Sequence, residues 1–210
     1  RNNYDFLTSG PVGKVILTMS IPTIISMLIT SIYNMADTFF VGKISTPATA
    51  AVGVTFSFMS VLQAIGFFFG QGSGTFISRR LGARDSQRAL GMASTAFFLA
   101  MGTEVALMIA GLLLLRPLSI LLGSTPTILP DTVVFLRCIL IGAPFMIGSM
   151  SLNNQMRFQG NATFAMFGML SGAIVNIILL PILIFVCKLG ILGAGLGTLI
   201  GQITGFFVLF

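Results

Sequence analysis

Long apolar runs alternate with short polar connections along the whole chain. A helix needs about 20 apolar residues to cross the hydrocarbon core of a bilayer. Gly, Pro, Ser or charged residues mark each connection, as is usual between helices. The pattern predicts an all-α, polytopic membrane protein whose single unit, 1–210, is a bundle of six transmembrane helices. The predicted spans are 15–40, 50–76, 90–115, 132–156, 164–186 and 191–210.

The composition narrows the class of protein further. Only 8% of the residues are charged, whereas a soluble domain carries about 25% and needs them to face water. With no His, no Trp and five acids, the chain is a poor match for a soluble enzyme or a zinc site. Cys138 and Cys187 lie in apolar stretches without metal-ligand spacing. We therefore expect no enzyme activity and no cofactor.

The basic residues predict an orientation. A net charge of +6 favours basic loops beside a membrane over a nucleic-acid partner, because cytoplasmic loops are enriched in Lys and Arg. We expect the chain to lie in the plasma (inner) membrane of a cell, with its N-terminus in the cytoplasm. In this orientation seven basic residues face the cytoplasm and three face outward. The seven are Arg1, Lys14, Arg79, Arg80, Arg84, Arg88 and Arg157; the three are Lys43, Arg116 and Lys188, with Arg137 near the outer end of its span.

Two glycine series predict where helices pack closely. Gly66, Gly70 and Gly74 recur every four residues in 50–76, and four glycines do so from Gly193 to Gly205. Small residues at this spacing let helix backbones approach each other in a membrane. A substrate path lined by glycine is the alternative. Transporters are often built from two related multi-helix halves, so we expect this chain to be the N-terminal half of one.

A polar stripe follows one face of the first span. Its members are separated by three and four residues, so they share one side of a helix. They are Thr23, Ser26, Thr30, Tyr33, Asn34 and Asp37. Hydrogen bonding between helices would explain the hydroxyls, and Asp37 alone could mark the outer interface. An acid within a membrane span is, however, a functional candidate by default. Pro22 allows a bend in the same helix.

Polar groups on other spans reach a similar depth. Asn176 and Thr198, like Asp37, fall in the outer half of the membrane at ~1.5 Å per residue, and Gln202 lies one turn from Thr198. A carboxylate, an amide and a hydroxyl together are able to ligate a small cation or solvate a proton acceptor. Pro181 frees a backbone carbonyl nearby.

Three more polar residues lie away from this group. Glu104, in the middle of the third span, is a secondary proton candidate without a polar stripe around it. Asn153 and Asn154 lie near the inner end of the fourth span, where they line an inward-facing mouth or end the helix.

Five short stretches resemble the multidrug and toxic compound extrusion (MATE) transporters, and bacterial drug-efflux members in particular. The likeness runs in order from about Ser9 to Phe210. The stretches are 33–42 (YNMADTFFVG), 79–84 (RRLGAR), 157–161 (RFQGN), 176–182 (NIILLPI) and 190–194 (GILGA).

The resemblance implies a twelve-helix transporter of two lobes, of which this chain is the N-lobe and the C-terminal lobe its partner. Such proteins export small organic, often cationic and lipophilic, compounds in exchange for protons or sodium. Carried onto this chain, the cation site comprises Asp37, Asn176 and Thr198, with Tyr33 beside them. Thr30, Tyr33, Asn34 and Gln202 would then line the substrate chamber.

One departure from the family pattern affects the coupling ion. Many members have Asp before the proline of the fifth helix, where this chain has Leu180. With one carboxylate at the site, proton coupling through Asp37 is favoured over sodium binding by Asp37, Asn176 and Thr198. The alternative function is a lipid or lipid-linked oligosaccharide flippase of the same superfamily. That function calls for several Arg or Lys in the chamber, and Arg137 is the only one that lies within a predicted span.

Overall fold

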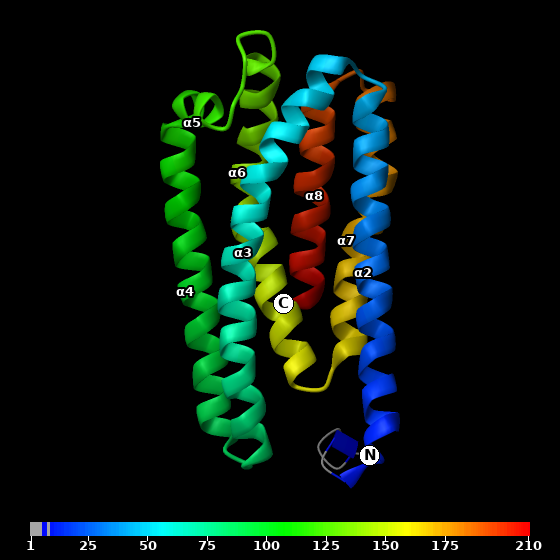
Figure 1. Cartoon of the computed structure of the whole chain (residues 1–210), viewed down its shortest axis with the longest axis vertical. Coiled ribbons are helices and arrows are strands. Elements are labelled where there is room, and N and C mark those ends of the chain that lie inside the picture. The colour runs from blue at the N-terminus through cyan, green and yellow to red at the C-terminus, as the bar shows by residue number, and fades with distance from the viewer. Residues whose placement is uncertain (1–5, 8) are drawn as a thin grey trace.

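The computed structural model describes residues 6–7 and 9–210, and within these residues every regular element is helical (Figure 1). Arg1, counted above among the cytoplasmic charges, lies outside the described residues. Six helices are long and apolar enough to cross a membrane, which agrees with the predicted fold class. The elements are α2 (Val12–Gly42), α3 (Thr46–Gly82), α4 (Ser86–Leu113), α5 (Leu115–Leu121), α6 (Leu129–Phe158), α7 (Ala162–Pro181), η1 (Ile182–Val186) and α8 (Ile191–Leu209).

Side-chain caps set the starts of three helices. The Ser45 hydroxyl accepts a hydrogen bond from the Ala48 N–H at 3.1 Å at the start of α3. Asp85 caps α4 through the Arg88 N–H at 3.3 Å, and Asn161 caps α7 through the N–H of Phe164 at 3.4 Å. These bonds satisfy backbone donors that the first turn of a helix leaves free. They also explain why the helices begin before the apolar runs used to predict them.

Two elements differ from the predicted spans. The third run, 90–115, is divided: α4 ends at Leu113 and a separate short helix, α5, follows at Leu115–Leu121. The fifth run, 164–186, also changes character, because α7 ends at Pro181 and continues as the π-helical turn η1. Proline lacks the N–H that an α-helix needs, so the change at Pro181 has a direct cause. By contrast, α2 continues through Pro22 as one α-helix.

The helix α6 forms the centre of the bundle. It packs against α3, α4, α5, α7 and α8, and it is the most buried of the six long helices. In contrast, α2 packs mainly against α7 and leaves most of its surface exposed. Figure 1 shows this arrangement, with α4 and α2 at opposite edges of the bundle and the N-terminus at the same end as the α3–α4 and α6–α7 turns.

Both glycine series lie where helices approach closely. Gly70 packs against Asn154 of α6, since a Cβ on Gly70 would lie 3.0 Å from the Asn154 Cβ. In α8, a Cβ on Gly201 would lie 2.9 Å from the carbonyl oxygen of Gly172 on α7. Close helix packing, the first of the two interpretations of these glycines, is therefore present at α3–α6 and α7–α8.

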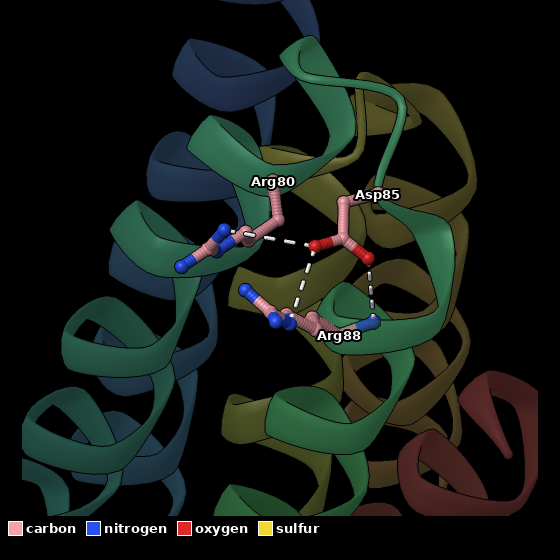
Figure 2. A network of polar contacts seen from close by, with 3 residues as sticks. All are labelled: Arg80, Asp85 and Arg88. Carbon is pink, nitrogen blue, oxygen red and sulfur yellow. Dashed lines mark hydrogen bonds and ion pairs between the residues drawn. The ribbon is translucent and has the colours of Figure 1, made fainter.

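A small ionic network joins α3 to α4 at the end of the bundle where the N-terminus lies. The Asp85 carboxylate is 3.6 Å from Arg80 and 3.5 Å from Arg88, as Figure 2 shows. All three side chains are partly or largely exposed, so each pair contributes about 0–1 kcal/mol. The network lies at the turn between the helices, and the other arginines near it leave this end strongly basic.

Candidate functional site

A cavity of about 430 Å³ opens between five helices of the bundle. Residues of α2, α3, α6, α7 and α8 line it, whereas α4 and α5 contribute none of the lining. Five methionines and one phenylalanine form its apolar wall: Met27, Met59, Met146, Met150, Met169 and Phe67. The polar lining consists of amides, hydroxyls and one arginine: Asn34, Gln63, Asn153, Asn154, Gln202, Thr30, Ser31, Tyr33, Ser149 and Arg157.

The four residues expected in a substrate chamber all line this cavity. Thr30, Tyr33 and Asn34 reach it from α2, and Gln202 reaches it from α8. The amide oxygen of Gln202 is buried and has no hydrogen-bond partner among the described residues. This oxygen packs against Gly142 of α6, which does not line the cavity, so it is buried in the contact between α6 and α8.

The three aliphatic hydroxyls of the α2 stripe bond within their own helix. Thr23, Ser26 and Thr30 each donate to the backbone carbonyl four residues earlier, at 2.8–2.9 Å. Hydrogen bonding between helices, one of the explanations considered for this stripe, is therefore not what satisfies these donors. Local bonding of this kind removes the cost of a hydroxyl in an apolar surrounding.

Tyr33 connects the cavity to the group expected to bind a cation. Its phenol lies near the side chains of Thr198 and Asp37, while the Thr198 hydroxyl itself donates to the carbonyl of Ala194 at 3.1 Å. Asp37 is partly buried, and its Oδ1 atom has no hydrogen-bond partner among residues 6–7 and 9–210. Two hydroxyls thus lie near a carboxylate that has one oxygen without a partner in the described structure.

Asn176 belongs to α7 and lies beside Gly201, about one turn of α8 beyond Thr198. It is fully buried and packs against Gly201, which itself lines the cavity. Both the Oδ1 and Nδ2 atoms of Asn176 are buried without a partner in the described structure. Leaving such an amide unsatisfied costs about 1–3 kcal/mol, so its two polar atoms are candidates for a bond to a water molecule or a polar ligand.

Leu180 occupies the position where many MATE members carry Asp. It is fully buried and packs against Gly197 of α8. The α7–α8 contact is therefore apolar one turn beyond Asn176, and Asp37 is the carboxylate nearest to the Tyr33–Thr198 pair among the described residues.

Glu104 lies apart from both the cavity and Asp37. It is fully buried, and neither of its carboxylate oxygens has a partner within the described structure. Met101 and Gly111, on the same side of α4, pack against Gly148 and Leu140 of α6. Glu104 consequently faces α6, and the structure does not bring the two expected proton sites together.

One end of the cavity lies near the turn between α6 and α7, and we call it the inner end because the predicted orientation places it toward the cytoplasm. It contains residues whose position the sequence left open or suggested otherwise. Asn153 and Asn154 line the cavity, which favours the first of their two interpretations. Arg157, counted above as a charge of a cytoplasmic loop, belongs to the last turn of α6 and lines the cavity as well. Arg137 is exposed and does not line it. The sequence contains one signal for the position of Arg157. It lies seven residues after Met150, so the two residues share one face of α6, and both line the cavity.

A helical membrane bundle with a cavity lined by convergent polar groups, and a partly buried acid near it, is typical of membrane transporters. The family model MatE matches residues 22–182. The chain belongs to this family, and is thus a multi-pass membrane protein of the transporter class rather than an enzyme.

Known relatives agree with this assignment. The chain is 30% identical over 208 residues to the multidrug export protein MepA of Staphylococcus aureus, a match that covers 98% of this chain and 46% of MepA. A solved multidrug resistance MATE family transporter of the MOP superfamily, in an outward-facing conformation, superposes with a TM-score of 0.91 at 30% identity. That match covers 99% of this chain and 46% of the other.

A MOP superfamily transporter from Pyrococcus furiosus, with a binding pocket of reverse polarity that suggests a different function, is equally similar in fold. Its TM-score is 0.91 at 30% identity, over 99% of this chain and 46% of the other. The chain thus spans about half the length of the relatives it matches.

Proposed function

We propose that this chain is the N-lobe of a secondary active multidrug exporter, which moves organic lipophilic, often cationic, compounds out of the cell in exchange for protons. The observation that carries the proposal is the position of Asp37, partly buried beside Tyr33 and Thr198 next to the cavity. The similarity to MepA, a multidrug export protein, supports the substrate class. The C-terminal lobe of the same transporter is the partner of this chain.

In this mechanism Asp37 takes up a proton from the outside. Protonation removes its charge, so the neighbouring cavity loses electrostatic attraction for a cationic substrate. Tyr33 connects the cavity with the proposed proton site, because it lines the cavity and also lies near Thr198 and Asp37. Deprotonation toward the cytoplasm would restore the attraction, and alternating access makes the exchange obligatory.

A proton is favoured over sodium as the coupling ion. A sodium site needs several oxygen ligands and benefits from formal negative charge. Here Asp37 would supply one carboxylate and Asn176 and Thr198 neutral oxygens, whereas Leu180 is apolar and packs against Gly197 of α8. Glu104 remains a secondary proton candidate of this proposal, acting at a distance from the cavity.

Efflux from intact cells tests the proposed function. The complete reading frame that encodes the chain is expressed in a drug-sensitive bacterial host, and export of a fluorescent lipophilic cation is followed. Export should occur with an intact proton gradient and stop when a protonophore collapses it. Export that depends on a sodium gradient instead would contradict the coupling ion. Absence of export would favour the lipid flippase, for which the arginine in the cavity is the supporting observation.

The proposed orientation has a test of its own. Cys187, at the end of η1, is exposed, whereas Cys138 is buried. With a cytoplasmic N-terminus, the turn between α7 and α8 lies outside, so a membrane-impermeant maleimide should label intact cells. The label should disappear in Cys187→Ser and persist in Cys138→Ser. Labelling that requires permeabilised cells would reverse the orientation.

A further inference from the structure

The charge of the cavity is concentrated at its inner end. Of the described residues that line the cavity, Arg157 alone carries a formal charge. The other polar lining groups are neutral amides and hydroxyls, and Asp37 is not among the lining residues. A ligand that enters this space therefore meets a positive charge at one end of an otherwise neutral wall.

The guanidinium of Arg157 has no anionic partner within the described part of the chain. Its Nη2 atom donates to the sulfur of Met169 at 3.6 Å, and its Nε atom is buried without any partner. The two ion pairs of the described residues both involve Asp85, in the α3–α4 turn. A guanidinium presents five N–H donors in a fork that suits carboxylates and phosphates. Most of those donors remain available here.

Two amides stand beside Arg157 on the same helix. Asn153 and Asn154 are buried and line the cavity. The Nδ2 atom of Asn153 donates to the carbonyl of Ala165 at 2.7 Å, and that of Asn154 donates to the carbonyl of Met150 at 2.9 Å. An amide nitrogen carries two hydrogens, so each of these groups retains one donor. The backbone bonds hold both side chains in place for a second interaction.

The wall beyond these donors is apolar. Met146 and Met150 precede Arg157 on α6, and Met27, Met59 and Phe67 face them from α2 and α3. Eleven residues separate Met146 from Arg157, which is about 16 Å along the helix axis at 1.5 Å per residue. Methionine side chains are flexible and polarisable, so such a wall accommodates apolar bodies of varied shape.

We propose that the inner end of this cavity binds the carboxylate or phosphate group of an amphiphile through Arg157, Asn153 and Asn154, with the apolar part of the molecule along the methionines. The inference rests on the proposed function in taking this cavity as the transport cavity. It deepens that function, because it adds lipophilic acids to a substrate class described above as lipophilic and often cationic.

Equilibrium binding to the purified product of the complete reading frame, in a neutral detergent, tests the proposal without requiring transport. The probe is 11-(dansylamino)undecanoic acid, and its methyl ester has the same apolar body without the charge. Charge-assisted hydrogen bonds contribute about 1.5–3 kcal/mol, so the acid should bind roughly tenfold to a hundredfold more tightly than the ester. Equal affinities for acid and ester would overturn the proposal, and this comparison needs no variant.

Variants locate the site. Arg157→Gln should bring the affinity for the acid down to that for the ester, while Arg157→Lys should retain most of the preference. Arg137→Gln removes an exposed arginine outside the cavity and should leave both affinities unchanged. An unaltered preference in a folded Arg157→Gln variant, or a loss in Arg137→Gln, would place the anion elsewhere and contradict the proposal.

Competition identifies the source of the acidic group. Lysophosphatidic acid should displace the bound probe, which would extend the site from carboxylates to lipid phosphates, whereas inorganic phosphate at millimolar concentration should not. Displacement by inorganic phosphate alone would contradict an amphiphile site. The outcome is separable from the proposed function: cation export that fails in the parent leaves this binding intact, and loss of the acid preference leaves cation export through Asp37 intact.

Discussion

Asp37→Asn is expected to reduce proton-driven export of a lipophilic cation to the background of cells that lack the transporter. The substitution keeps the size and polarity of the side chain but removes the proton that is exchanged and the negative charge that favours a cation. Efflux of a fluorescent cation from energised cells measures the effect, and the amount of protein in the membrane is compared by immunoblot.

Glu104→Gln provides the matched control for Asp37→Asn. Both changes replace a carboxylate within the membrane by an amide, but Glu104 faces α6 away from the cavity and from Tyr33. We therefore expect Glu104→Gln to reduce export less than Asp37→Asn. Unaltered export by Asp37→Asn would refute the mechanism, and complete loss by Glu104→Gln alone would make Glu104 the primary proton site.

Gly172→Ala should lower the thermal stability of the protein markedly. A Cβ at Gly172 would lie 2.7 Å from the carbonyl oxygen of Gly201 and 3.4 Å from the Cα of Gly205. Backbone atoms cannot rotate aside as a side chain does, so α7 and α8 would have to separate. Overpacking of this kind costs about 1–3 kcal/mol, and we expect the melting temperature in detergent to fall by several degrees.

Gly102→Ala serves as the control for that prediction. Gly102 lies within α4, and a Cβ there would have no neighbour within 4 Å. Alanine is also the better helix former, so the melting temperature should stay the same or rise slightly. If Gly172→Ala melted at the temperature of the parent, the close contact between α7 and α8 would not be limiting for stability.

The number and order of the long helices were predictable because the bilayer imposes a length of apolar sequence on each of them. The polar stripe of α2 was predictable for a similar reason, since Tyr33 and Asp37 are one helical turn apart on any α-helix. The contact between Tyr33 and Thr198, however, depends on how α2 and α8 pack. Spacing within one helix carries no information about that distance.

Two features, the break between α4 and α5 and the position of Arg157 in the cavity, could not be predicted from the hydropathy pattern of the sequence. Leu114, between α4 and α5, is as apolar as its neighbours, so nothing in the hydropathy pattern marks the end of α4. Arg157 directly follows an apolar run. Because basic residues usually end a membrane span, the sequence pattern predicts a loop position for it. Its place in the cavity follows from the packing of α6 at the centre of the bundle, which is a property of the whole fold.

The methionine wall of the cavity has a chemical consequence beyond its shape. Hypochlorous acid and peroxides convert methionine to its sulfoxide, which turns a flexible apolar side chain into a polar one. Five such residues line this space, so an oxidative burst acts on the lining of the cavity itself. Each sulfoxide oxygen adds a strong acceptor to an otherwise apolar surface. A cell that repairs these residues with methionine sulfoxide reductases would thereby also restore the apolar surface of the cavity.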